Sequence, residues 1–190
     1  LVFMEDLAFS IDRGVFLESF RYDHLAEAVG RSIEVQQANV SVSSRGVLRG
    51  IHFVDVPVGQ SKFITVLAGS LIDFVVDLRV GSPTFGQWQG VRLDEDTRKA
   101  VYLSEGLGHG FCALTDDATL TDMCSATYNP GHEHGIYPLD AELGIDWPAR
   151  EPQLSERDIK SPSLAEARDS GLLPSYEACL GYTRSLARQG

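Results

Sequence analysis

The sequence predicts an all-β fold, an antiparallel double-sheet jelly-roll barrel with a few peripheral helices. From Gln36 to about Asp146 the chain is built of short segments rich in Val, Ile, Thr and Phe. Glycines, prolines and Asp-rich turns separate these segments at intervals of about 8 to 12 residues, the spacing of a sandwich or barrel. The 190 residues, 43% of them hydrophobic, fit one domain with a full core.

Residues 1–35 precede this pattern and are predicted to include one short helix. The stretch RYDHLAEAVG, residues 21–30, predicts a helix of about two turns. We expect Asp23 to be its N-cap and Gly30 to end it as the C′ residue.

The barrel core is predicted to span residues 36–147. Alternating or continuous apolar patterns bounded by turn residues define its strands. The predicted strands are residues 35–43, 47–53, 61–69, 71–79, 85–93, 100–105, 111–115 and 119–128.

Residues 148–190 are predicted to form a C-terminal helical segment of the same single domain. The stretch SLAEA carries a capping box, Ser163 with Glu166, which predicts the start of a helix. Residues 175–188 predict a second helix with basic residues late in it, where they complement the helix dipole.

Charge and cysteine content restrict the classes of function. Sixteen Lys plus Arg against 27 Asp plus Glu give a net charge of -11, a field that repels nucleic acid and anionic membranes. Three scattered cysteines without a C-x-x-C motif argue against a disulfide scaffold and suit a reducing cytoplasm. Neither a run of about 18 apolar residues nor a signal-peptide pattern is visible, so we expect a cytoplasmic protein without a membrane partner.

The stretch RGVLRGIHF, residues 45–53, places a basic residue and an imidazole within an apolar strand. Strict alternation puts Arg49 and His52 on opposite faces. A bulge at Gly50 would bring both onto one face, because glycine tolerates the conformation that a bulge needs. The alternative is that His52 is an interior hydrogen-bonded histidine and Arg49 an exposed charge on a strand edge.

Two further histidine motifs raise the alternative of a metal-dependent cupin. SEGLGHGF, residues 104–111, resembles the second metal motif of cupins and contains His109. However, no second histidine lies two positions from His52, and two scattered imidazoles without a carboxylate at ligand spacing make a poor metal site. His132 and His134 in GHEHG could be a ligand pair, but their position after Pro130 favours a solvated loop.

Taken together, four stretches resemble the dTDP-4-dehydrorhamnose 3,5-epimerase family, including its members in antibiotic-sugar pathways. The resemblance runs from about residue 12 to residue 176, with the order and spacing of the stretches kept. They are residues 41–53, 60–88, 102–111 and 128–148.

The resemblance implies a cofactor-independent epimerisation of a dTDP-linked 4-keto-6-deoxyhexose at C3, C5 or both. This reaction needs a base on one side of the ring, a proton donor on the other and a cation near the ketone oxygen. His52 matches the family's base, and Asp158 matches the carboxylate that orients it. Lys62 matches the residue near the ketone oxygen, although without the family context a surface lysine would be an equal interpretation.

The resemblance also implies where the nucleotide would bind. Arg13 and Arg49 match residues at the phosphates, and two guanidiniums could hold a pyrophosphate despite the acidic chain. His109 would lie near the sugar. Gln37 and Asn39 lie two residues apart on one predicted strand, so their side chains point to the same face. Their amide groups would extend the polar floor of the site, that is, the polar inner surface on which the ligand would lie.

The thymine base is expected to contact Phe16, Glu18 and Tyr128. In the family the N-terminal segment is exchanged between subunits, so Phe16 and Glu18 would reach a partner's site. The resemblance therefore implies a homodimer.

One position departs from the family pattern. The family's proton donor is a tyrosine six residues before the thymine-stacking tyrosine, and the stretch DMCSATYNP places Asp122 there. An aspartate is ordinarily ionised at neutral pH and cannot donate a proton. We expect Asp122 to face the interior and to allow proton abstraction while inversion is slow or water-mediated. The alternative is a dTDP-sugar-binding homologue with weak or no epimerase activity.

Overall fold

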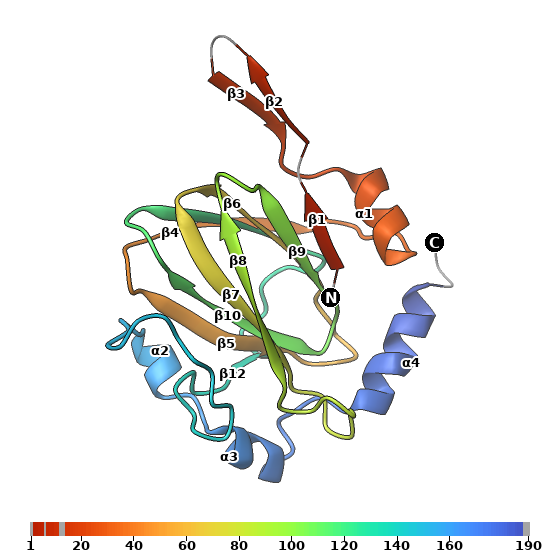
Figure 1. Cartoon of the computed structure of the whole chain (residues 1–190). Helices are drawn as coiled ribbons and strands as arrows, with labels where there is room; N and C mark the ends of the chain where they lie inside the picture. The colour runs from red at the N-terminus through yellow and green to blue at the C-terminus, as the bar shows by residue number, and fades with distance from the viewer. Residues whose placement is uncertain (1, 6, 12–13, 188–190) are drawn as a thin grey trace.

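Two five-stranded antiparallel sheets form the body of the protein (Figure 1). The computed structural model describes residues 2–5, 7–11 and 14–187. The all-β jelly-roll prediction is confirmed, and the few helices lie around the two sheets (Figure 1). No helix in these ranges is long and apolar enough to cross a membrane.

The first sheet joins the N-terminal strand to four strands from the middle of the chain. Its order is β1 (Val2–Glu5), β9 (Lys99–Leu103), β6 (Lys62–Ala68), β11 (Ala118–Cys124) and β4 (Gln37–Ser43). Strand β4 is therefore an edge strand.

The second sheet faces the first. Its order is β12 (Glu133–Gly135), β5 (Leu48–Val54), β10 (Leu107–Ala113), β7 (Ser70–Asp77) and β8 (Trp88–Asp94). The main hydrophobic core joins inward side chains of both sheets, such as Ile64 and Val101 from the first with Leu71 and Leu93 from the second.

Helices and loops cover the outer faces of the sheets. Helix α1 (Tyr22–Val29) covers the first sheet, where its Leu25 belongs to the same apolar cluster as Phe63 and Tyr102. On the second sheet, Ile51 and Phe53 of β5 are covered by residues from the C-terminal part, including α3 (Leu164–Asp169). The remaining helices are α2 (Glu156–Ile159) and α4 (Tyr176–Leu186).

A two-stranded hairpin, β2 (Leu7–Ile11) and β3 (Gly14–Glu18), projects away from the barrel (Figure 1). The side chain of Phe16 on β3 is 64% exposed, and Val15 is exposed as well. An aromatic ring left in solvent on a projecting hairpin marks a surface suited to contact with another chain.

The local predictions have mixed outcomes. Gly30 ends α1 in the left-handed conformation as predicted, but the N-cap is Arg21 rather than Asp23. Asp23 lies in the first turn and binds the Arg21 guanidinium, so its carboxylate is not available as a cap. Ser163 and Glu166 form the predicted capping box of α3.

The strand predictions are confirmed for the barrel but missed several elements. Strands β1, β2, β3 and β12 and the short helix α2 were not predicted. Strand β10 begins at Leu107, earlier than the predicted start at residue 111, so His109 lies within the strand. The stretch GHEHG likewise contains β12, which pairs with β5, and the solvated-loop interpretation was wrong for residues 133–135.

The predicted bulge near Gly50 is present in β5. Along β10, His109 lies opposite His52 and Phe111 lies opposite Arg49, so three steps along β5 match two along β10. Gly50 has a φ of 127°, and a Cβ there would collide with the backbone of Gly110. The extra residue places Arg49 and His52 on the same face of the sheet, as expected.

Candidate active site

Polar side chains gather on the facing surfaces of β4 and β11 in the first sheet and β5 and β10 in the second. The register aligns Asn39 with Asp122 and His52 with His109. At the other side of the barrel the facing side chains are apolar and buried. One side of the space between the sheets is therefore polar, and the opposite side forms the core.

His52 and Asp158 form a hydrogen-bonded pair, as predicted, with 2.7 Å between His52 Nε2 and Asp158 Oδ1. The His52 side chain keeps 30% of its surface exposed, whereas that of Asp158 is buried. Because Nε2 faces the carboxylate, Nδ1 of His52 is the ring nitrogen left for a reaction partner.

The first turn of α2 holds Asp158 in place. Ser155 is the N-cap of this helix, and its hydroxyl accepts from the backbone N–H of Asp158 and donates to Asp158 Oδ2. Burial alone would raise the pKa of Asp158, but the hydrogen bond and charge of His52, together with Ser155, outweigh it and hold this pKa below its usual value. The carboxylate is thus kept ionised beside the imidazole.

On the opposing sheet, Lys62 and Asp122 form an ion pair with 3.1 Å between Lys62 Nζ and Asp122 Oδ2. Asp122 Oδ1 accepts from the thiol of Cys124 at 3.4 Å. Burial alone would lower the pKa of Lys62, but the charge of Asp122 and its hydrogen bond raise it above the usual value. Asp122 faces the interior as expected, and Lys62 is a partly buried ion-paired residue rather than a surface lysine.

His109 pairs with an aspartate that the sequence analysis missed. Asp73 Oδ2 lies 3.0 Å from His109 Nδ1, and both side chains are buried. Among the residues that the structure describes, none is a hydrogen-bond partner of Asp73 Oδ1. The stretch LIDFVVD, residues 71–77, could have predicted this residue. Asp73 alternates with Leu71 and Val75, so its acidic side chain points to the same face as two core side chains.

Glu133 was also missed. It lies on β12 opposite Val54, and its charge reaches Lys62 across the space between the sheets. The backbone oxygen of Glu133 accepts from Arg157, the neighbour of Asp158. Its carboxylate therefore belongs to the electrostatic environment of the Lys62–Asp122 pair.

The predicted polar floor is present next to these pairs. Gln37 Nε2 donates to Asn39 Oδ1 at 2.8 Å, and Gln37 Oε1 accepts from the backbone N–H of Tyr128 at 2.7 Å. Arg49 Nε donates to Ser43 Oγ at 3.2 Å. This hydrogen bond joins β5 of the second sheet to β4 of the first, on the polar side of the space between the sheets. The guanidinium remains exposed and can take an anion.

The residues expected around the thymine base are dispersed in the single chain. The Tyr128 side chain is 52% exposed on the loop after β11. Phe16 and Glu18 lie on the projecting hairpin, and Arg13 lies outside the described residues.

His132 and His134 share one carboxylate. His132 Nδ1 lies 3.1 Å from Asp55 Oδ2, and His134 Nε2 lies 2.9 Å from Asp55 Oδ1. Across residues 2–5, 7–11 and 14–187, no group of three or more His, Cys, Asp or Glu side chains is arranged to hold a metal ion. The two imidazoles fix the loop after Tyr128 to the end of β5.

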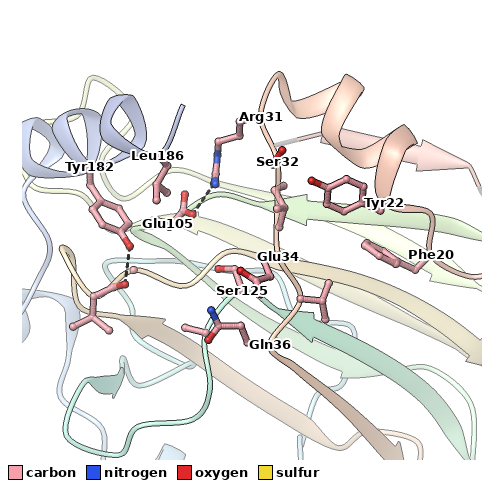
Figure 2. Close-up of a pocket in the computed structure, with 15 residues that line it drawn as sticks. Phe20, Tyr22, Arg31, Ser32, Glu34, Gln36, Glu105, Ser125, Tyr182 and Leu186 are labelled. Carbon is pink, nitrogen blue, oxygen red and sulfur yellow. Dashed lines mark hydrogen bonds and ion pairs between the residues drawn. The ribbon is translucent and has the colours of Figure 1, made fainter. Parts of the chain in front are cut away.

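A separate pocket of about 780 Å³ lies outside the barrel, between the segment that follows α1 and helix α4 (Figure 2). Its lining includes the Arg31–Glu105 ion pair, at 2.6 Å, and Tyr182. None of the predicted site residues that the structure describes lines it, so it is distinct from the polar inner face.

Comparison with known proteins identifies the family. The sequence pattern of the dTDP-4-dehydrorhamnose 3,5-epimerase family matches residues 1–166. The chain belongs to this family. A dTDP-4-dehydrorhamnose 3-epimerase of Streptomyces niveus is 60% identical over 171 residues, which are 90% of this chain and 83% of that protein. A dTDP-4-dehydrorhamnose 3,5-epimerase of Streptomyces griseus is 50% identical over 98% of this chain and 93% of its own length.

Solved structures of the family agree with the fold. NovW, a 4-keto-6-deoxy sugar epimerase from the novobiocin cluster of Streptomyces spheroides, superposes with a TM-score of 0.90 at 58% identity, over 93% of this chain and 89% of that one. ChmJ, a 3'-monoepimerase of Streptomyces bikiniensis in complex with dTDP-quinovose, gives a TM-score of 0.94 at 46% identity, over 97% and 94%. The chain is therefore an epimerase of the isomerase class, as predicted.

We expect Asp158→Asn to change the acid side of the stability profile. The pKa of Asp158 is lowered on folding, so the stability it contributes is present above the unfolded-state pKa of about 3.9 and is lost as pH falls through the lower folded value. Urea unfolding at a series of pH values should show a free energy of unfolding that falls less steeply below about pH 4 in the variant. Glu156→Gln, at an exposed position of the same helix, serves as control, and parallel curves for wild type and Asp158→Asn would contradict the expectation.

Proposed function

We propose that this protein epimerises a dTDP-linked 4-keto-6-deoxyhexose at C3, C5 or both, with His52 as the base. The observation that carries the proposal is the His52–Asp158 pair on an inner face, opposite the Lys62–Asp122 pair on the other sheet. The named activities of the related epimerases support the same substrate class.

The chemistry begins at a carbon next to the ketone, where the proton is acidic enough for an imidazole to remove. His52 takes this proton, and Asp158 stabilises the imidazolium that forms. Negative charge moves to the ketone oxygen, where the ammonium of Lys62 or the imidazole of His109 can donate a hydrogen bond. Neither group needs a cofactor for this role.

The nucleotide end of the ligand is anionic, whereas the chain carries a net charge of -11. Arg49, exposed beside the polar floor, and Arg13 from the N-terminal segment are the groups we assign to the pyrophosphate. Tyr128 is assigned to the thymine, with Phe16 and Glu18 supplied by a second copy of the chain.

A second candidate is a dTDP-sugar-binding protein with weak or no epimerase activity. The observation that favours it is Asp122, which stands where the family has its donor tyrosine and which is already paired with Lys62. The retained His52–Asp158 pair favours the active enzyme, because a binding protein has no need of an oriented base. The buried free thiols of Cys112, Cys124 and Cys179 support action in the cytoplasm.

We predict that His52→Ala abolishes proton exchange while dTDP binding stays nearly intact, because the imidazole acts on the sugar and not on the nucleotide. Deuterium incorporation from D₂O into dTDP-4-keto-6-deoxyglucose, followed by NMR, should slow by a factor of about 100 or more. Calorimetric titration with dTDP should be unchanged. His24→Ala on α1 is the matched control, and exchange at the normal rate in His52→Ala would remove this residue as the base.

We predict that dTDP binds far more tightly than thymidine and that its affinity falls with added salt, since charge-assisted contacts dominate the phosphate end. Arg49→Ala should weaken dTDP about 10-fold or more and leave thymidine nearly unchanged. Arg45→Ala, at an exposed position in the turn before β5, is the control. Equal affinity for nucleoside and nucleotide would refute the phosphate assignment.

A homodimer is the assembly we propose, because Val15 and Phe16 on the hairpin and Val40 and Val42 on edge strand β4 are exposed. Light scattering should give twice the chain mass of 20.8 kDa. Phe16→Asp should lower the dimer fraction, since it puts a charge into an apolar contact. Ile159→Asp, also at an exposed apolar position, should not, and a monomeric wild type would contradict the proposal.

A further inference from the structure

We propose that Lys62 donates the proton to the sugar on the face opposite His52, and that Asp122 is the residue that positions its ammonium group. This inference rests on the proposed epimerisation and assigns the donor that the missing tyrosine leaves open. It also explains why an aspartate can stand at this position in an enzyme.

The first argument is placement. His52 lies on β5 of the second sheet, whereas Lys62 and Asp122 lie on β6 and β11 of the first. The charge of Glu133, beside β5, acts on Lys62, so the ammonium lies within electrostatic reach of the second sheet. A sugar ring between the sheets has the base on one face and the Lys62–Asp122 pair on the other.

The second argument is that both carboxylate oxygens of Asp122 already accept hydrogen bonds. Its Oδ2 accepts from Lys62 Nζ at 3.1 Å and its Oδ1 accepts from Cys124 Sγ at 3.4 Å. An ionised carboxylate is an acceptor only. The ammonium has three N–H groups, of which one is directed at Asp122, and it keeps 17% of its side-chain surface exposed.

The third argument concerns the other proton-bearing groups nearby. Burial and the charge of Asp122 raise the pKa of the Cys124 thiol to about 12, and that thiol is buried against the carboxylate. His109 lies on the same sheet as His52, directly opposite it on the neighbouring strand, and so approaches the sugar from the side of the base. Tyr128 lies on the loop after β11, not on a strand of the first sheet, and is 52% exposed. Among the ionisable groups named here, Lys62 is therefore the donor that the first sheet places opposite His52.

The proton transfers balance as follows. His52 Nδ1 takes the proton from C3 or C5, and the electron pair of the broken C–H bond forms the enolate, with its negative charge on the ketone oxygen. Lys62 Nζ then gives one proton to the same carbon from the other face. The N–H electron pair stays on nitrogen, the ketone is restored, and Lys62 is left as a neutral amine. Exchange with solvent returns both side chains to their starting states.

The donor identity has a kinetic consequence. An ammonium whose pKa lies above the usual lysine value is a weaker acid than a tyrosine phenol with a pKa of about 10. The enolate therefore receives a proton from Lys62 less readily than it would from a tyrosine, which leaves more time for the proton to return from His52. Deuterium exchange should exceed inversion, as the departure at Asp122 already led us to expect.

The first arm of the experiment is Lys62→Arg, assayed in D₂O on dTDP-4-keto-6-deoxyglucose with exchange and inversion measured separately. Arginine keeps a cation near the ketone oxygen but does not give up its proton. We expect exchange to fall by less than about 10-fold and inversion by more than about 100-fold. A proportional loss of both rates, or no loss of either, would overturn the assignment of Lys62 as donor.

The second arm is the pH profile of inversion in Asp122→Asn. The Asp122 carboxylate raises the pKa of Lys62 and burial lowers it, so removal of the carboxylate leaves burial dominant and this pKa falls. The alkaline limb of kcat/KM for inversion should move to lower pH. A residue that only stabilises the fold would not move this limb, and an unmoved limb would overturn the positioning role. Asp117→Asn, an exposed carboxylate in the turn before β11, is the control.

The two proposals fail in different ways. A wild-type protein that neither exchanges nor inverts any dTDP-4-keto-6-deoxyhexose would refute the proposed function. A wild-type protein that inverts the substrate, together with a Lys62→Arg variant that inverts it equally well, would refute only the donor assignment.

Discussion

The bulge at Gly50 is the constraint on which the arrangement of the inner face depends. It lets Arg49 and His52, three residues apart, face the same way, which a regular strand forbids. The close approach of Gly110 on β10 leaves no room for a side chain at Gly50. The proposed base and the guanidinium assigned to the phosphates can thus come from a single strand.

Charged side chains placed between two sheets lose hydration free energy. In this protein that loss is offset because basic groups contact carboxylates. His52 with Asp158, Lys62 with Asp122 and His109 with Asp73 each bring a basic group against a carboxylate. Unpaired, any of these groups would lose its hydration without a compensating contact. Asp158 comes from the C-terminal segment beyond the barrel strands, so that segment completes the inner face as well as covering the outer one.

The sequence was sufficient to predict the barrel strands, because apolar runs between glycine-rich turns determine them locally. It was insufficient for β12 and α2, whose three or four residues form only against β5 and around the Ser155 cap. Asp73 and Glu133 were missed for a related reason. The residues with which these two acids interact, His109 and Lys62, are distant in sequence and come close to them only in the folded sheets.

Asp122 stands at the position of the family's donor tyrosine and also changes the electrostatic character of the site. Beside a neutral tyrosine, the Lys62 ammonium would present a full charge to the ketone oxygen; beside a carboxylate it presents part of a neutral pair. Stabilisation of the enolate must then depend on a short, directed N–H contact rather than on long-range attraction, because a paired charge has only a dipolar field. Such a contact requires a fixed ammonium, and fixing it is what the hydrogen bond to Asp122 achieves. The carboxylate that stands in place of the usual proton donor thus holds Lys62 in position for the donor role proposed for it.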